Sequence, residues 1–296
     1  MISEDFTFEN VRKVARAVAV YLMNHQLTQQ PLIVGYDARF LAERFAAEVV
    51  KVMEEAGCFN YLVDRDAPTP VIEWEVKDKE AAGAFMITAA SSPSQYCGIK
   101  FIKGEAGPCA ADCTKEIQTY IFLEVAPTTA SVPNQVLLNY QSAMSQMKAG
   151  QKAKSREQRF EPRERYSKHL EGLVDASVIK KAKLKVVVDP MYGSGRGYLD
   201  KVLQRLGCQV EEIHNWRDVL FGGKSPDPTE ENLAELKAKV LQNKADIGIA
   251  LNGDASSFAV IDQEGKFHPG DPGGDAILKC VIMLAEGKIY GKKIET

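Results

Sequence analysis

The chain has 296 residues, of which 45% are hydrophobic and 26% are charged, and its formal net charge is -3. This composition is typical of a globular protein, and the length predicts two domains or slightly more. A nucleic-acid-binding surface is disfavoured, because proteins that neutralise many phosphates carry a basic surplus. No apolar run approaches the roughly 18 residues of a membrane helix, and the acidic N-terminus is unlike a signal peptide. We therefore expect a cytoplasmic protein that binds neither nucleic acid nor membrane.

Apolar periodicity predicts alternating helices and strands in the first half of the chain. Thr7 is a good helix cap, and apolar residues follow it at helical spacing. Residues 31–39 predict a buried strand, residues 40–57 an amphipathic helix closed by Gly57, and residues 58–64 the next strand. The alternation continues through residues 67–90. It is typical of an α/β sheet, mostly parallel, between layers of helices.

The pattern weakens over residues 126–152, and we place a domain boundary near Arg163. The basic stretch 147–170 also carries three glutamates, which favours a solvated linker and helix start over an anion site. A second α/β unit follows, with helices over 166–182, 200–207 and 230–244 and strands over 183–189, 208–214 and 245–251. We thus predict two tandem α/β/α domains with mixed, mostly parallel sheets, at 1–163 and 164–258, and the start of a third domain at 259–296.

Six cysteines are scattered without the paired spacing of a disulfide framework: Cys58, Cys97, Cys109, Cys113, Cys208 and Cys280. In a cytoplasmic chain of this length they are expected to be free thiols. Cys109 and Cys113, with Cys97 nearby, could be imagined as zinc ligands, but no second Cys or His pair follows at the spacing of a zinc finger. Incidental small residues in a loop are the simpler interpretation.

Seven segments match one family in order: SEDFTFENV, VGYDARF, PTPVIEW, MITAASSPSQYCGIKF, VVVDPMYGSGRGYL, FGGKSPDPTEENL and ADIGIALNGDASSFAVIDQEG. They resemble the α-D-phosphohexomutases, the phosphoglucomutases and phosphomannomutases of the bacterial type. Ordered matches over residues 3 to 265 are far more specific than a single glycine motif. The resemblance implies three related α/β domains and a smaller fourth one around a deep cleft, and this chain is expected to hold the first two and the start of the third.

In such enzymes a phosphoryl group moves between the 1- and 6-positions of a hexose through a phosphoserine, which demands an oxygen nucleophile, a divalent cation and an acid or base. The family's serine loop has the pattern TASHNP followed by NGxK, and here Pro93, Gly98 and Lys100 fix the register. Ala90 then occupies the serine position, and a methyl group cannot carry phosphate. Ser91 is a poor substitute, because a misplacement of about 1 Å costs on the order of a hundredfold in rate. Lys100 remains as a candidate acid or base, or as an exposed lysine at a strand end.

The family's metal loop has the pattern DGDADR, in which three aspartates converge on one Mg²⁺. The corresponding segment here is NGDASS: Asp254 remains, and Asn252 and Ser256 stand in the other two ligand positions. Because Mg²⁺ is held mainly by carboxylate charge, this loop predicts no tight binding, and Asp254 becomes a turn residue. We therefore expect no cofactor, although the resemblance implies Mg²⁺ in active relatives.

The remaining motifs give weaker indications of function. The glycine turn at 190–199 has the wrong spacing for a dinucleotide fingerprint. Asp37 and Arg39 follow a strand, where the resemblance implies that they brace the catalytic loop and a mutual salt bridge is the simplest account. Four histidines stand apart from one another and receive no role: His25, His169, His214 and His268.

The serine nucleophile and two metal-binding carboxylates are lost together. This combination predicts a catalytically inactive relative of the phosphohexomutases with a binding, regulatory or oligomerising role. Its expected partner is a second copy of the chain or an active mutase. The alternative is a fragment or variant of an active mutase that interconverts hexose 1-phosphate and 6-phosphate. A predicted helix near residue 280 carries five apolar residues without a complete sheet to cover them: Ile277, Leu278, Val281, Ile282 and Leu284. Such a helix either folds back on the second domain or pairs with a second chain, and we favour a homodimer.

Overall fold

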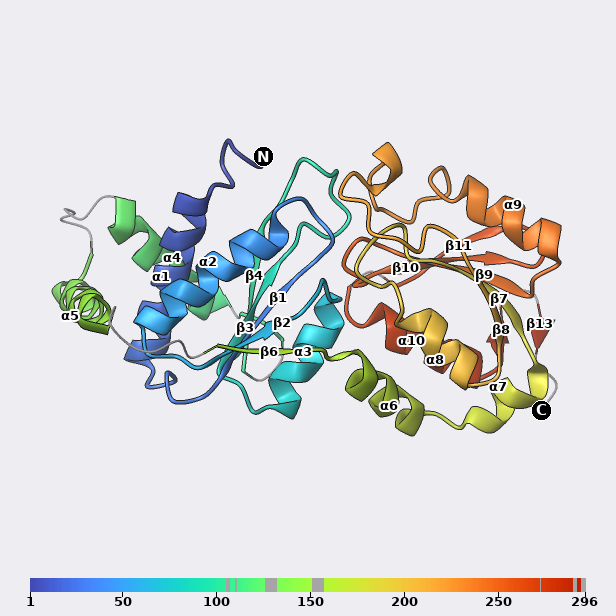
Figure 1. The fold of residues 1–296 in the computed structure, drawn as a ribbon, viewed down its shortest axis with the longest axis horizontal. Helices are drawn as coiled ribbons and strands as arrows, with labels where there is room; N and C mark the ends of the chain where they lie inside the picture. Colours follow the sequence, from blue (N-terminus) through green and yellow to red (C-terminus); the bar gives the residue numbers. More distant parts are fainter. Residues whose placement is uncertain are drawn as a thin grey trace.

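The computed structural model describes residues 1–104, 107–109, 111–125, 132–150, 157–271, 273–289 and 292–293. Within these residues two α/β units lie side by side, each built on its own sheet (Figure 1). We call residues 1–160 the first unit and residues 163–289 the second unit. No helix among the described residues is both long enough and apolar enough to cross a membrane.

The first unit contains α1 (Phe8–Asn24), β1 (Leu32–Tyr36), α2 (Ala42–Glu55), β2 (Asn60–Val63), α3 (Thr69–Asp78), β3 (Gly83–Ile87), β4 (Ile99–Lys103), β5 (Gly107–Pro108), α4 (Ala111–Val125), α5 (Asn134–Gly150) and β6 (Glu157–Phe160). Its strand order is β5-β4-β3-β1-β2-β6. The strands β3, β1, β2 and β6 are parallel, β4 pairs antiparallel with β3, and β5 pairs antiparallel with β4. All of β1 is buried, as expected for a central strand.

The second unit contains α6 (Arg163–Leu173), α7 (Ala176–Ala182), β7 (Lys185–Asp189), α8 (Leu199–Arg205), β8 (Gln209–Glu212), a 3-10 turn η1 (Phe221–Gly223), α9 (Ala234–Asn243), β9 (Ile247–Leu251), β10 (Phe258–Asp262), β11 (Phe267–Pro269) and α10 (Ala276–Ala285). Its strand order is β11-β10-β9-β7-β8. β9, β7 and β8 are parallel, β10 pairs antiparallel with β9, and β11 pairs antiparallel with β10. A short ribbon of β12 (Lys288–Ile289) and β13 (Lys292–Lys293) follows.

The alternation of side chains along β7 places helices on both faces of the second sheet. Val186 and Val188 join the core that contains residues of α8 and α10, whereas Val187 joins the core under α9. Successive residues of a strand point to opposite faces, so a continuous apolar run marks a strand covered on both sides. The predicted fold class, α/β with mixed and mostly parallel sheets, is confirmed.

Three details of the predicted organisation were wrong. The weak pattern over 126–152 includes the helix α5, and the basic stretch 147–170 includes β6, which extends the first sheet. The single helix expected over 166–182 is two helices, because Asp175 adopts an extended backbone and its side chain accepts a hydrogen bond from the Ser177 amide at 2.8 Å, which starts α7.

The residues expected to begin a third domain at 259 instead complete the second unit. β10 pairs with β9 in antiparallel register, and α10 packs on the same core as α8. Ile277, Val281 and Leu284 are fully buried there, and Ile282 is on the exposed side of the helix. Of the two arrangements considered for this helix, the structure has the one in which it folds back on its own chain.

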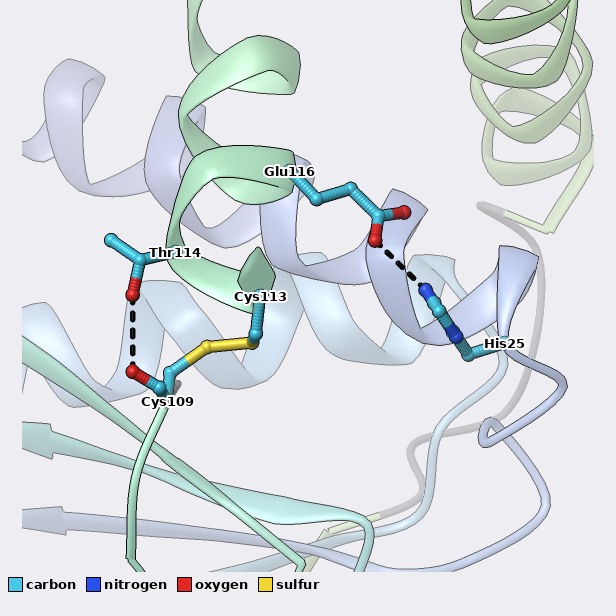
Figure 2. The surroundings of a disulfide bond; sticks show 5 residues. All are labelled: His25, Cys109, Cys113, Thr114 and Glu116. Atoms are coloured by element: carbon cyan, nitrogen blue, oxygen red, sulfur yellow. Dashed lines mark hydrogen bonds and ion pairs between the residues drawn. A yellow bond between two sulfur atoms is a disulfide. The ribbon is translucent and has the colours of Figure 1, made fainter. Parts of the chain in front are cut away.

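The expectation of six free thiols was wrong for one pair, because Cys109 and Cys113 form a disulfide with a Cα–Cα distance of 5.7 Å (Figure 2). Cys113 lies in the first turn of α4, and the Thr114 hydroxyl donates to the Cys109 carbonyl at 3.1 Å. On the same helix, Glu116 pairs with His25 at 2.9 Å and so ties α4 to the end of α1. The other four cysteines, Cys58, Cys97, Cys208 and Cys280, are not part of a disulfide.

Candidate functional site

Two loops meet where the two units face each other, one after β3 and one after β9. The Asn252 amide nitrogen donates to the Ser91 hydroxyl at 3.1 Å, and the Ser225 hydroxyl donates to the Ser91 carbonyl. A Cβ atom on Gly253 would lie only 2.7 Å from the Ala90 carbonyl oxygen, so this close approach requires glycine. Both loops follow the carboxyl ends of parallel strands, which is where α/β sheets build their sites.

Ala90 has the left-handed backbone conformation, with φ of 49°. Its amide donates to the Thr88 hydroxyl at 2.9 Å, and Thr88 in turn donates to Asp37 at 2.6 Å. Left-handed backbone is uncommon for residues other than glycine and clusters at functional loops. The loop therefore holds a strained, specific conformation at a position whose side chain is a methyl group.

Arg39 holds this loop in place. Its side chain is fully buried, and its Nε donates to Asp37 at 3.1 Å. The other four guanidinium hydrogens are donated to backbone carbonyls of the loop, at Pro93 (2.9 Å), Tyr96 (3.0 Å), Ala90 (2.8 Å) and Ser92 (2.7 Å). Burial raises the pKa of Asp37 to about 6, against the opposing effects of Arg39 and Thr88. The salt bridge and the bracing role expected from the sequence are thus both present.

Asp254 is completely buried and is held by groups from both units. Its Oδ2 accepts hydrogen bonds from Thr69 at 2.7 Å and from the Lys100 ammonium at 2.8 Å, and its Oδ1 accepts one from the Ser256 hydroxyl at 2.6 Å. Burial by itself would raise the pKa of Asp254, but Lys100, Ser256 and Thr69 together outweigh it and hold the pKa below its ordinary value. Lys100 thus provides the positive charge that this carboxylate faces.

Magnesium does not fit the residues of this loop. Both oxygens of Asp254 already accept hydrogen bonds, and the Lys100 ammonium is its ion-pair partner at 2.8 Å. The Asn252 side-chain oxygen accepts from the Ser257 amide at 3.0 Å, and the Ser256 hydroxyl is directed at Asp254. A hard cation needs several oxygen ligands with negative charge, and this set offers one carboxylate that is already neutralised.

The structure brings together the residues singled out from the sequence: Ala90, Ser91, Lys100, Asn252, Asp254 and Ser256. Sequence reasoning missed Thr69 and Ser225. Both lie in matched segments, PTPVIEW and FGGKSPDPTEENL, so the resemblance marked their neighbourhoods but gave no contact between these segments and the two loops.

Further polar contacts fix the two units against each other. Arg196 of the second unit donates to Asp66 of the first at 2.6 Å, and both side chains are buried. Arg217 donates to the Ala38 carbonyl at 3.1 Å and to Glu43 at 2.9 Å. The two loops therefore meet within a polar interface that has several independent anchors.

Comparison with known proteins defines the class. The family model for phosphoglucomutase/phosphomannomutase alpha/beta/alpha domain I matches residues 1–126, and the model for domain II matches residues 164–265. The chain therefore belongs to the α-D-phosphohexomutase family, which is a family of intramolecular phosphotransferases.

Individual relatives agree with this assignment. The phosphoglucomutase/phosphomannomutase of Thermococcus kodakarensis is 28% identical over 294 residues, which are 99% of this chain and 60% of the relative. The phosphoglucosamine/phosphogalactosamine mutase of Sulfurisphaera tokodaii is 28% identical over 93% of this chain and 55% of its own. A solved structure named as a putative phosphomannomutase of Thermus thermophilus has a TM-score of 0.75 and 26% identity, and the match covers 90% of this chain and 55% of that one. The chain thus spans little more than half the length of these relatives.

Proposed function

We propose that this chain does not transfer phosphoryl groups through its serine loop and that it acts as a binding or regulatory protein of the phosphohexomutase family. One observation carries the proposal: Ala90 occupies the nucleophile position of a loop that is otherwise firmly held, while Lys100 neutralises the one remaining carboxylate of the metal loop. The family's reaction needs a nucleophile and a cation at these two places. Neither requirement is met by the side chains present.

Ser91 is not an activated replacement for the missing serine. Its hydroxyl oxygen accepts a hydrogen bond from the Asn252 amide, and an amide nitrogen cannot remove a proton from a hydroxyl group. Its backbone carbonyl is held by Ser225. A nucleophilic serine needs a neighbouring base within hydrogen-bond reach, and these contacts do not supply one.

A binding role is supported by the apolar side chains around Arg39. Phe40 follows Arg39 in the chain, Tyr96 belongs to the loop that Arg39 holds, and Leu220 precedes Phe221, whose ring lies 5.0 Å from the Arg39 guanidinium. These three side chains are 53%, 43% and 59% exposed. Large exposed apolar side chains are typical of protein-binding surfaces, so we expect a second copy of the chain or an active mutase to bind at these segments beside Arg39.

Activity measurements test the proposal. The purified chain should show no glucose or mannose phosphate mutase activity, and Mg²⁺ should give no rise in melting temperature, as linkage requires of any ligand that prefers the folded state. Stabilisation by Mg²⁺ that disappears in Asp254→Ala would show that the loop still binds metal. Measurable mutase turnover would favour the alternative, a variant of an active hexose phosphate mutase.

Restoring the lost residues provides the matched control. Ala90→Ser alone should remain inactive, because the metal loop still lacks two carboxylates. A variant that combines Ala90→Ser with Asn252→Asp and Ser256→Asp restores the serine of the first loop and the three carboxylates of the second. Mg²⁺ binding that appears only in the combined variant would support the view that the scaffold is retained and only the chemistry is lost.

A further inference from the structure

A second group of side chains, unrelated to the two loops, lies in the second unit at the carboxyl ends of β7 and β8. Asp189 ends β7, His214 follows β8, and Glu235 lies in the first turn of α9. An open cleft of about 390 Å³ lies beside them, lined by Tyr192, Glu212, Ile213, His214, Asn215, Trp216 and Glu235. Crevices outside the carboxyl ends of parallel strands are common ligand sites.

Two carboxylates surround the His214 imidazole and favour its protonated form. Its Nδ1 lies 3.1 Å from both oxygens of Asp189, and its Nε2 lies 3.1 Å from Glu235. An imidazole donates from both nitrogens to carboxylates only when both carry hydrogen, so these two contacts favour the protonated ring. The Tyr192 ring lies over this imidazole, with 4.5 Å between ring centroids and a tilt of 33°. One face of Tyr192 therefore lies against a ring that can carry a positive charge.

Trp216 provides a second aromatic wall. Its ring centroid lies 5.0 Å from that of Tyr192, and the two ring planes are nearly perpendicular at 78°. The Trp216 side chain is 59% exposed, so a large part of its ring is open to solvent. In this edge-to-face contact the two ring planes are nearly perpendicular, and the exposed part of each ring's negative face is available to a cation in the cleft.

The backbone that presents these rings is unusual. Met191, Tyr192 and His214 have φ angles of 46°, 59° and 50°, and the Tyr192 amide donates to the His214 carbonyl at 3.1 Å. Left-handed conformations of bulky residues are energetically unfavourable, and they concentrate at ligand sites where the surrounding structure holds them. Three such residues in contact set the relative orientation of the aromatic rings.

Two carboxylates, Glu212 and Glu235, line the cleft itself. Glu235 and Asp189 contact His214, and the Lys201 ammonium is 3.6 Å from Glu212. A further lysine, Lys224, lines the smaller neighbouring pocket of about 150 Å³. Burial raises the pKa of Tyr192, and the nearby carboxylates Glu235, Asp189 and Asp218 raise it further, as expected of a negative environment.

We propose that this cleft binds a small organic ammonium ion, with Tyr192 and Trp216 as aromatic walls and Glu235 as the counter-ion. Aromatic rings and carboxylates are the groups that proteins combine to recognise quaternary and primary amines. Glu235 is 62% exposed and makes its contact to His214 through one oxygen, Oε2. Its other oxygen can face an incoming cation.

The test compares choline with its uncharged carbon analogue, 3,3-dimethylbutan-1-ol, which has the same shape. Binding is followed by the fluorescence of Trp216, and the second tryptophan, Trp74, is replaced by phenylalanine to give a single reporter. We expect saturable binding of choline and binding of the alcohol that is about tenfold weaker or worse, because only the charged ligand gains the cation–π interaction. A parallel titration with spermidine determines whether primary ammonium groups bind as well as quaternary ones.

Two variants test whether Trp216 and Glu235 form the binding site, and calorimetry measures the binding of choline to each variant. Trp216→Ala removes an exposed side chain, so the variant should fold, and it should bind choline about tenfold more weakly. Glu235→Gln should weaken binding while preserving the shape of the cleft, whereas Glu230→Gln, an exposed acid outside the cleft, should change nothing. Equal affinity for choline and the neutral alcohol, or no saturation at tens of millimolar choline, would overturn the proposal.

Discussion

Replacing Lys100 with methionine tests whether the Lys100–Asp254 ion pair joins the two units. The pair has a 2.8 Å contact, with Asp254 fully buried and the Lys100 side chain 41% exposed. Removing one partner of a fully buried pair costs about 3–5 kcal/mol, because the remaining charge is left unpaired. Here water can reach the site of the exposed lysine, and Thr69 and Ser256 still donate to Asp254. We therefore expect a loss of about 1–3 kcal/mol in the free energy of unfolding.

Urea denaturation at pH 7, followed by circular dichroism, measures this loss. A double-mutant cycle with Asp254→Asn isolates the interaction, and we expect a coupling energy of at least about 1 kcal/mol. Lys103→Met on the same strand is the control, and it should change stability by no more than about 0.5 kcal/mol. A coupling energy below about 0.3 kcal/mol would refute the view that this pair joins the two units.

The pH dependence provides a second check on the same pair. The pKa of Asp254 is lowered in the folded state from its ordinary value of 3.8. Its stabilisation is therefore present above pH 3.8 and is lost as the pH falls through the lowered folded value. In Lys100→Met the ammonium no longer lowers the pKa of Asp254, so the effect of burial, which raises it, is less well balanced. The difference in stability between the natural sequence and Lys100→Met should therefore be largest near neutral pH and should shrink in acid.

Three further substitutions test other parts of the structure. Arg39→Met removes the four guanidinium hydrogen bonds to the serine loop, and it should lower the free energy of unfolding by more than about 3 kcal/mol because it leaves the buried Asp37 carboxylate without its ion-pair partner. The pKa of His214 is raised above its ordinary value of 6.5, mainly by the hydrogen bond to Asp189. The stabilisation by His214 should therefore be complete below pH 6.5 and be lost as the pH rises through the raised folded value, and His214→Gln should abolish this pH dependence. Ile277→Ala should cost about 2–5 kcal/mol, and Ile282→Ala on the exposed side of the same helix should cost far less; equal effects would contradict the packing of α10 on its own chain.

Much of the fold could be predicted because local signals agree with the global pattern. Thr7 accepts a hydrogen bond from the Asn10 amide at 3.2 Å and starts α1 where the sequence placed it. α5 was missed because its contribution to the core is small, with Ala143 and Met147 as its fully buried residues, so its apolar periodicity is weak. β6 was missed because an edge strand with polar residues has no distinctive pattern of its own.

The site could be predicted only where the family pattern fixed the register. The positions of Ala90 and Asp254 followed from the matched loops, but the contact between Lys100 and Asp254 joins residues that are 154 apart in the chain. No periodicity or local motif contains such a pairing, which depends on how the two units are placed. The disulfide could not be predicted from the sequence either, because a four-residue spacing of cysteines is compatible with free thiols as well as with a bridge.

Mass spectrometry of the chain after incubation with glucose 1,6-bisphosphate and Mg²⁺ tests the central claim most directly. Intact mass shows whether any phosphate is taken up, and peptide mapping shows where it lies. We predict no phosphate on residues 88–98, either in the natural sequence or in Ala90→Ser, because the first lacks the nucleophile and both lack the carboxylates of the metal loop. A stoichiometric phosphoserine at Ser91 or Ser92 in the natural sequence would contradict the claim that this loop has lost its chemistry.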